Sequence, residues 1–290
     1  AMNYLQLNKN LVVLADENYV NDFQRLTSLK RSLFKMEKSV VFILSNRIPK
    51  KFTVEASHEI NEQKLANVVG VIPGKSRKDE LVIFSAHYDH LGVGKPVGGD
   101  SIYNGANDDA AGTTAVIMLA KYFKALENNE RTIVFAAFTA EEIGGYGSQY
   151  FSRQLNPDKV MAMFNIEMIG TESKWGKNSA YITGYEKTNM GEFLTNNLTG
   201  TEFIFYPDPY PQQQLFYRSD NATLARLGVP AHTISTAKMD GEPHYHKVTD
   251  QIETLDMDNM AKIIKAIALS SGTIISGKDT PTRVKVEELR

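Results

Sequence analysis

The sequence predicts an α/β fold: a single domain in which a mixed, mainly parallel β-sheet is sandwiched between helices. From about residue 65 onward, short runs rich in β-branched residues alternate with runs of helical periodicity. Strands that alternate with helices favour parallel pairing, because each crossover helix covers one face of the sheet. The segment RTIVFAAFTA (131–140) is almost continuously apolar, which is typical of a strand buried on both faces.

The expected elements follow one another along the chain. Runs of β-branched and aromatic residues predict strands at 68–74, 80–87, 131–140, 159–166, 179–184 and 229–235. Apolar residues at helical spacing predict helices at 110–127, 145–154, 187–198 and 257–275. The segment 203–220 is dense in aromatic residues and prolines and is too irregular for a strand. We expect it to form a packed surface loop or a pocket wall for an apolar side chain.

The first 64 residues leave two alternatives open. LVVL (11–14), SVVFILS (39–45) and KFTVEA (51–56) predict strands, with a helix between about 18 and 37. These strands would either form the edge of the same sheet or be the remnant of a truncated neighbouring domain. We therefore expect one domain over residues 1–290, with its core at about 65–275.

Composition excludes several classes of protein. The chain has 290 residues, and 32 Lys and Arg against 34 Asp and Glu give a net charge of -2, without the basic run that nucleic acids or anionic membranes attract. No apolar stretch approaches the roughly 18 residues of a membrane span, and AMNYLQLNKN lacks the pattern of a signal peptide. The sequence contains no cysteine, so a metal site must use histidine, aspartate and glutamate.

Polar side chains follow the ends of the predicted strands. The candidates are His87, Asp108, Asp109, Glu141, Glu142, Glu167, His244 and His246. Taken singly, such residues are most often helix caps, first-turn acids or ordinary loop residues. The carboxyl ends of parallel strands share one edge of a sheet, so we expect these side chains to converge there. Uncompensated carboxylates would repel one another, whereas divalent cations would neutralise them.

The set fits a centre of two metal ions, which needs a bridging carboxylate and a histidine with a further carboxylate for each ion. Asp108 would bridge the two ions. His87 and Glu167 would complete the first position. Glu142 and His246 would complete the second.

Four sequence blocks make the prediction more specific. HYDHLG, YNGANDDAAG, TAEEIGGYGS and YHKVTD resemble the signature blocks of the co-catalytic dinuclear zinc aminopeptidase family, whose relatives include glutamate carboxypeptidase and the glutaminyl cyclases. The resemblance covers about residues 65–275. It implies a zinc exopeptidase (phosphorylase/hydrolase-like) fold, two zinc ions and the ligand set above, with Asp89 orienting His87 by accepting its free ring N–H. Glu167 departs from the aspartate usual in the family, and SDN (219–221) from its usual Ser-Asp-His.

The expected function is a zinc-dependent aminopeptidase that removes N-terminal residues from peptides. A metal-activated water would attack the peptide carbonyl, with Glu141 as general base. We expect the substrate to contact Tyr217, Arg218, Asp220 and Tyr245. Because the guanidinium of Arg218 could bind a substrate carboxylate, a carboxypeptidase or dipeptidase remains an alternative function.

Three other functions remain as alternatives. A glutaminyl cyclase would use a single zinc, and a non-catalytic binding domain would have lost its ligands. A dinucleotide enzyme is suggested only by GVGKPVGG, which lacks a third glycine at the right offset and reads better as a mobile loop over the site.

Some properties follow only from the resemblance, and others are left open by the sequence. Because relatives are mostly exported, the resemblance implies a periplasmic or secreted bacterial protein. A peptide substrate is the only partner expected, and the oligomeric state is open. Among the spare histidines, His90 is expected at the pocket rim or in a structural role, and His244 has no assigned role.

Overall fold

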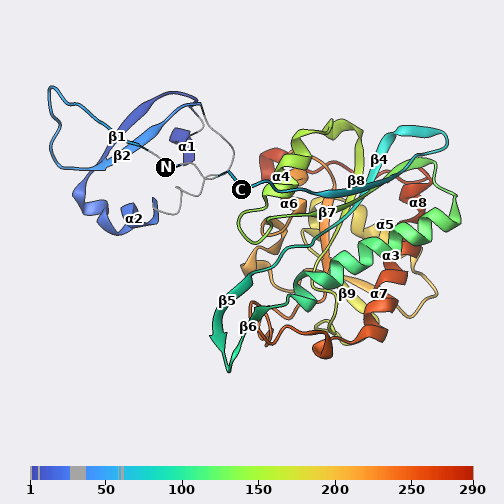
Figure 1. Ribbon diagram of the computed structural model, residues 1–290. Coiled ribbons are helices and arrows are strands. Elements are labelled where there is room, and N and C mark those ends of the chain that lie inside the picture. The colour runs from blue at the N-terminus through green and yellow to red at the C-terminus, as the bar shows by residue number, and fades with distance from the viewer. Residues whose placement is uncertain (1, 6, 27–36, 58, 60–61, 290) are drawn as a thin grey trace. The chain divides into compact units, whose positions relative to one another are not determined.

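The computed structural model describes residues 2–5, 7–26, 37–57, 59 and 62–289. The chain divides into two compact units, Ala1–Gln63 and Lys64–Arg290 (Figure 1). A single domain over residues 1–290 stays a prediction.

A seven-stranded sheet forms the centre of the larger unit. Its strand order is β10-β9-β11-β8-β4-β7-β3. The strands are β3 (Val68–Ile72), β4 (Arg77–His87), β7 (Arg131–Phe138), β8 (Val160–Ile166), β9 (Ser179–Ile182), β10 (Ile204–Pro207) and β11 (Ala231–Ser235). The four central strands pair in parallel, β3 and β9 run antiparallel to their inner neighbours, and β10 is parallel to β9. The predicted mixed, mainly parallel α/β sheet is confirmed.

Helices cover both faces of this sheet (Figure 1). One face packs against α3 (Ala111–Leu126), α5 (Met190–Asn197), α7 (Met257–Ser270) and α8 (Gly272–Ile275). The other packs against α4 (Tyr146–Arg153) and α6 (Asn221–Ala225). The expected helix at 257–275 is therefore two helices that meet at Ser271. None of the helices in the described ranges has the length and apolar character needed to cross a membrane.

Strand β4 shows why the apolar runs of this sequence fold as buried strands. Successive side chains point to opposite faces, so Phe84 packs on one face and Ile83 on the other, both with no exposed surface. The Phe84 ring stacks on Phe123 of α3 and on Phe164 of β8, at centroid distances of 5.6 and 4.9 Å. Burial on both faces fixes the strand, and therefore the place where its last residue, His87, leaves the sheet.

Arg131 ties the last residues of the chain to the sheet. Its side chain, at the start of β7, is only 1% exposed. The guanidinium donates to Glu80 Oε2 at 2.7 Å and to the carbonyl oxygens of Ile274 and Asp279, both at 2.7 Å. It also donates to Thr280 Oγ1 at 2.5 Å. These acceptors compensate the burial of a charge that would otherwise be strongly destabilising.

Two segments differ from expectation. Residues 203–220 were expected to contain no strand, but Ile204–Pro207 pairs with β9 as β10. The buried Phe205, packed on the ring of Phe203, favours an extended backbone there. The glycine-rich segment GVGKPVGG, expected to be a mobile loop, instead forms the hairpin of β5 (Gly92–Val97) and β6 (Asp100–Tyr103). Gly98 and Gly99 close it with φ of 62° and 92°, which glycine adopts without strain.

The smaller unit contains α1 (Met2–Leu5), β1 (Leu11–Ala15), η1 (Glu17–Tyr19), α2 (Val20–Arg25) and β2 (Val40–Leu44). Strands β1 and β2 pair in parallel in a sheet of their own, so the edge-strand alternative is wrong. Residues 51–56 form no strand, because most of their side chains are exposed and no neighbouring strand pairs with them among the described residues. The expected helix at 18–37 is helical at Val20–Arg25, and its residues 27–36 lie outside the described residues.

Candidate metal centre

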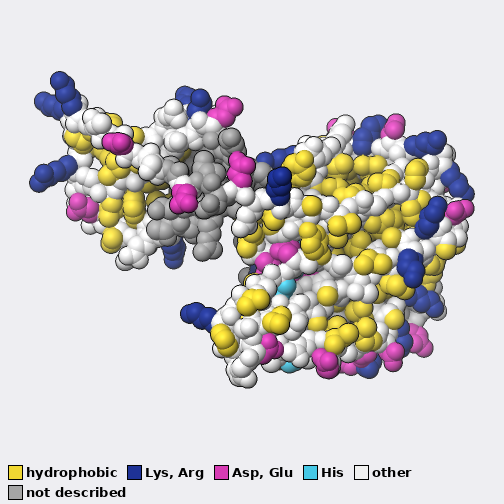
Figure 2. Space-filling view, viewed as in Figure 1, with side chains coloured by type: hydrophobic (Ala, Val, Ile, Leu, Met, Phe, Trp, Pro, Cys, Tyr) yellow, Lys and Arg dark blue, Asp and Glu magenta, His cyan; other side chains and the backbone are white. Residues whose placement is uncertain are grey.

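The five predicted metal ligands meet at the carboxyl ends of the central strands. His87 is the last residue of β4, Glu142 and Glu167 follow β7 and β8, and Asp108 lies in η3 (Ala106–Ala110) at the entrance to α3. His246 comes from the loop after β11. Figure 2 shows acidic and histidine side chains side by side on one face of the larger unit. The structure brings the five together, and their role as ligands stays a prediction.

Asp108 lies between two histidines. Its Oδ1 is 3.2 Å from His87 Nε2, and its Oδ2 is 3.3 Å from His246 Nε2. Glu142 Oε2 is 3.2 Å from the same His246 nitrogen. Ligand atoms of His87, Asp108 and Glu167 all lie within 4.8 Å of one another. A carboxylate with one oxygen facing each histidine has the geometry needed to bridge two cations.

His90 also lies in the cluster, contrary to the expectation of a rim or structural position. Its Nδ1 lies 2.7 Å from Glu142 Oε1, and His90, Asp108 and Glu142 form a second group whose ligand atoms are within 4.8 Å. His244, in contrast, pairs with Thr249 Oγ1 at 3.0 Å and belongs to neither group.

The cluster fits divalent cations because its buried polar atoms lack other partners. The atoms without a hydrogen-bond partner include His87 Nε2, both ring nitrogens of His90, Asp108 Oδ2 and Glu142 Oε1. Buried polar groups are almost always hydrogen-bonded or bound to an ion, so a set of orphaned atoms facing one another marks a binding site. Carboxylate oxygens and imidazole nitrogens are donors that zinc accepts.

Asp89 supports the site differently from the prediction. His87 Nδ1 lies 3.0 Å from the backbone carbonyl oxygen of Asp89 and 3.9 Å from its carboxylate. The carboxylate instead accepts the backbone N–H groups of Glu141 and Glu142, at 3.1 and 3.3 Å. The prediction that His87 donates to this carboxylate is therefore wrong. The backbone carbonyl of Asp89 orients the His87 ring, and the carboxylate of Asp89 fixes the backbone of Glu141 and Glu142 after β7.

Two buried aspartates position the loop that carries Asp108. Asp250 accepts the N–H groups of Asn107 at 2.8 Å and of Asp108 at 3.1 Å. Asp109 accepts from Gly112 N at 3.0 Å and from the N–H of Met168, which follows Glu167, at 3.1 Å. The sequence patterns assign no role to Asp250, although this residue ends the block YHKVTD that contains His246. Its place in that block was the available signal.

A chain of hydrogen bonds leads to Glu167. Ser85 Oγ donates to Asn165 Oδ1 at 2.7 Å, and Asn165 Nδ2 donates to Ser219 Oγ at 2.7 Å. Ser219 Oγ in turn donates to Glu167 Oε2. These hydrogen bonds fix the longer glutamate side chain. The sequence patterns do not single out Ser219, although it neighbours the predicted contact residue Asp220.

A protein-family model matches residues 67–270, more than half of the chain, under the description Peptidase family M28. The chain belongs to Peptidase family M28. A relative described as a probable leucine aminopeptidase, from Trichophyton verrucosum (strain HKI 0517), is 27% identical over 270 residues, covering 87% of this chain and 71% of the relative.

Solved structures share the fold of this M28 chain. The LapA aminopeptidase of Legionella pneumophila aligns with a TM-score of 0.59 at 22% identity, covering 72% of this chain and 55% of LapA. The glutaminyl cyclase of Porphyromonas gingivalis aligns with a TM-score of 0.56 at 17% identity, covering 72% of this chain and 77% of the cyclase. This chain spans about half the length of the LapA chain.

The acidic groups of the M28 site strongly perturb one another. Burial, together with the Glu167 carboxylate, raises the pKa of Glu141 to about 9. Burial also raises the pKa of Glu167 to about 7. Burial alone would raise the pKa of Asp108, but the neighbouring imidazoles of His246 and His87 bring it below its usual value. Like charges crowded at one sheet edge are the condition that bound cations relieve.

The backbone of the site adopts unusual conformations at three positions. Ala140, which precedes Glu141, has φ of 57°, and Met168, which follows Glu167, has φ of 53°. His246 itself has φ of 56°. Left-handed backbone is uncommon for residues with a side chain and is concentrated at functional sites, where the surrounding structure holds it.

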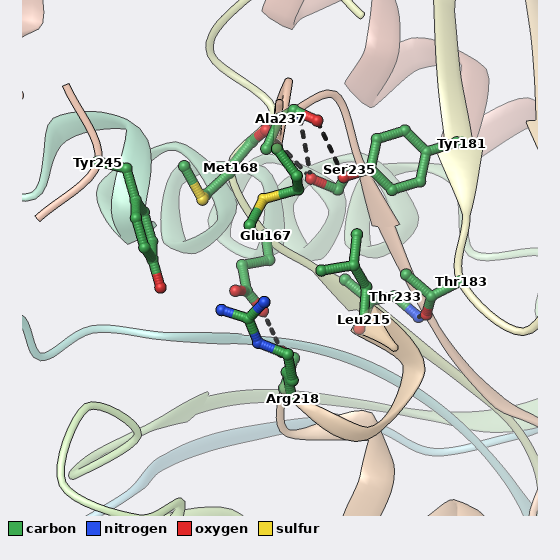
Figure 3. Close-up of a pocket in the computed structure, with 12 residues that line it drawn as sticks. Glu167, Met168, Tyr181, Thr183, Leu215, Arg218, Thr233, Ser235, Ala237 and Tyr245 are labelled. Carbon is green, nitrogen blue, oxygen red and sulfur yellow. Dashed lines mark hydrogen bonds between the residues drawn. The ribbon is translucent and has the colours of Figure 1, made fainter. Parts of the chain in front are cut away.

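A pocket of about 50 Å³ opens beside Glu167 (Figure 3). Arg218 and Tyr245, both predicted from the sequence to contact substrate, line this pocket together with Glu167. Its other lining residues are Met168, Tyr181, Thr183, Leu215, Ser219, Thr233, Ser235, Ala237 and Met239.

The other two residues selected for substrate contact lie outside this lining. Tyr217 packs against the ring of Phe216, at a centroid distance of 5.2 Å. Asp220 is buried with both carboxylate oxygens unpartnered, and burial raises its pKa to about 6.

Proposed function

We propose that residues 64–290 are the catalytic unit of an aminopeptidase that binds two zinc ions and hydrolyses the N-terminal residue from peptides. The observation that carries the proposal is the position of Asp108, with one carboxylate oxygen facing His87 and the other facing His246. The family membership supports it, as does the aminopeptidase description of the relatives. The Glu141 carboxyl beside this cluster supplies the group that a hydrolase needs to move a proton.

The residues of the site divide the chemical tasks. Zinc, when bound, supplies a Lewis acid that makes a water molecule acidic and offsets negative charge on the substrate oxygen. Glu141 takes the proton from the attacking water and returns it to the departing amine. The raised pKa of Glu141 suits a group that must hold a proton between these two steps, and cations beside Glu142 and Glu167 would bring that pKa down toward neutrality.

The pocket beside Glu167 is proposed to receive the N-terminal side chain of the substrate. Leu215, Met168 and Met239 give it an apolar lining suited to residues such as leucine, the residue in the names of the relatives. Arg218 lines the same pocket and supports a second candidate function, a carboxypeptidase or dipeptidase in which its guanidinium binds the substrate carboxylate.

The test is a panel of chromogenic aminoacyl amides assayed with the purified chain, after chelation and after zinc is restored. We expect zinc-dependent hydrolysis, fastest with apolar residues, and no hydrolysis of N-acetylated analogues. Cleavage of N-acetylated peptides with a free carboxyl terminus would replace the aminopeptidase by a carboxypeptidase. An active protein with one zinc per chain and cyclising activity on N-terminal glutamine would favour the cyclase. A protein that takes up no zinc would contradict the proposal altogether.

A further inference from the structure

His90 has the position of a metal ligand. Its side chain is 6% exposed, and its Nδ1 is 2.7 Å from Glu142 Oε1 and 3.9 Å from Asp108 Oδ2. The side chains of Asp108 and Glu142 are also buried, at 3% and 6% exposure. One nitrogen and two carboxylate oxygens therefore face a common point from three different segments of the chain.

Hydrogen bonding does not account for this arrangement. His90 Nδ1, Asp108 Oδ2 and Glu142 Oε1 all lack a hydrogen-bond partner, although the first and the last are 2.7 Å apart. The distance is short enough for a hydrogen bond, so it is the alignment that fails. Three unsatisfied buried atoms would be costly in a site that held nothing, whereas one cation among them would satisfy all three.

The backbone makes room for the imidazole of His90. A Cβ on Gly105 would lie 2.5 Å from His90 Cγ, and Gly105 has φ of 66°. A side chain at residue 105 would therefore push the ring away from the cluster. The glycine at the start of η3 allows the ring to lie against the loop that carries Asp108.

His246 approaches the same two carboxylates from another direction. Its Nε2 is 3.3 Å from Asp108 Oδ2 and 3.2 Å from Glu142 Oε2. The two imidazole rings are 5.8 Å apart between centroids and inclined at 70°. The rings are therefore not stacked on each other, and both can direct a nitrogen at one ion.

We propose that His90 Nδ1 is a direct ligand of the cation held by Asp108 and Glu142, so that this position has two imidazoles, His90 and His246. Two imidazoles and two carboxylates complete a tetrahedral zinc site. The position at His87, Asp108 and Glu167 has three protein ligands and therefore stays open for water and substrate. The inference rests on the metal centre of the proposed function and is independent of its substrate.

The asymmetry predicts the order of metal binding. The first equivalent of zinc added to the metal-free protein should occupy the position with four protein ligands. X-ray absorption of the protein loaded with one equivalent should show two imidazoles per zinc. His90→Ala should show fewer and should weaken the binding of that first equivalent at least about 100-fold, because a direct ligand contributes more than the supporting residues do.

His90→Asn separates a ligand from a hydrogen-bond donor. The asparagine amide nitrogen falls near the place of Nδ1 and can donate to Glu142, but it does not replace an imidazole on zinc. We expect His90→Asn to lose as much zinc affinity as His90→Ala. His244→Ala, a histidine outside both groups, is the matched control and should bind zinc as the original protein does.

Two results would overturn the proposal. The first is one imidazole per zinc in the unmodified protein loaded with one equivalent. The second is a His90→Asn protein with unchanged affinity and imidazole count, which would make His90 an orienting donor for Glu142. These measurements use no substrate. A protein that binds zinc through two imidazoles but has no peptidase activity would therefore contradict the proposed aminopeptidase function and leave the role of His90 as a ligand intact. Failure to bind any zinc would contradict both.

Discussion

The carboxylate of Asp89 accepts the backbone N–H of Glu141 at 3.1 Å and, through its other oxygen, that of Glu142 at 3.3 Å. Asp89 leaves the sheet after β4 and the glutamates leave it after β7, so this side chain joins two neighbouring strand exits. The proposed general base, Glu141, and a predicted metal ligand, Glu142, are therefore both positioned by a residue two places beyond His87. Changes at Asp89 should act on catalysis through Glu141 as well as on metal binding.

Substitution of Asp89 tests this link. Asp89→Ala removes both acceptors and should lower kcat roughly 10- to 100-fold, in line with the loss of residues that support a metal site. Asp89→Asn keeps one acceptor oxygen and should retain more of the activity. Steady-state kinetics and zinc content measured on the same preparations would decide. Equal kcat in the three proteins would show that these hydrogen bonds do not position Glu141.

Glu141→Gln should keep its metal and lose turnover. The amide has the size of the carboxyl but cannot take a proton from water, so kcat should fall by at least about 100-fold. Zinc content should match that of the unmodified protein. Glu253→Gln, at an exposed glutamate outside the site, should leave both quantities unchanged. Activity of Glu141→Gln close to that of the unmodified protein would remove Glu141 from the role of base.

Ser219→Ala should weaken zinc at the position of His87 and Glu167. The substitution removes the hydroxyl that donates to Glu167 Oε2 and breaks the chain that starts at Ser85. We expect a loss of about 10- to 100-fold in the affinity for zinc at this proposed position. Competition with a chromophoric chelator would measure it. Ser219→Thr keeps a hydroxyl and should restore the affinity, whereas equal losses in both variants would point to packing instead.

His232, a buried histidine outside the candidate metal centre, should make the stability of the folded protein depend on pH. Burial lowers its pKa to about 4. Its ring nitrogens pair with Thr183 O and Thr188 Oγ1, both at 2.8 Å. The unfolded chain binds a proton at this histidine near pH 6.5, whereas the folded protein does so only near pH 4. The stabilising contribution of neutral His232 to the free energy of unfolding is therefore fully present above pH 6.5. It is lost as the pH falls toward 4, by up to about 3 kcal/mol.

Urea unfolding between pH 8 and pH 4 would measure the effect of His232. His232→Asn, which keeps a donor to Thr183 O but does not titrate, should show a flatter dependence on pH, even where it is less stable at pH 8. An identical dependence in the two proteins would assign the loss of stability to other groups.

The outline of the site could be predicted because it depends on local signals. Apolar runs indicate the strands, and because parallel strands end at one edge of the sheet, the sequence predicts that His87, Glu142 and Glu167 lie together there. Asp250 and Ser219 could not be assigned in the same way. Their partners, Asp108 and Glu167, lie 142 and 52 residues away, and only the folded chain pairs them.

The predictions for His90 and for the segment that forms β10 were wrong for related reasons. His90 is one residue from Asp89, and spacing alone could not place its ring in the cluster, since that position depends on the space beside Gly105. For β10, the prolines and aromatics of 203–220 hid a short strand whose stability comes from β9 and from burial of Phe205. Tertiary contacts commonly override such local composition.

The acceptors of Arg131 affect how this protein can be shortened for laboratory work. The family match ends at residue 270, which makes that position an obvious place to cut the gene. A protein ending there would lack Ile274, Asp279 and Thr280, and the guanidinium would keep only Glu80 among the partners that hold it. Buried charge without compensation favours unfolding. Expression boundaries placed beyond Thr280 should give soluble material where a boundary at 270 gives aggregates.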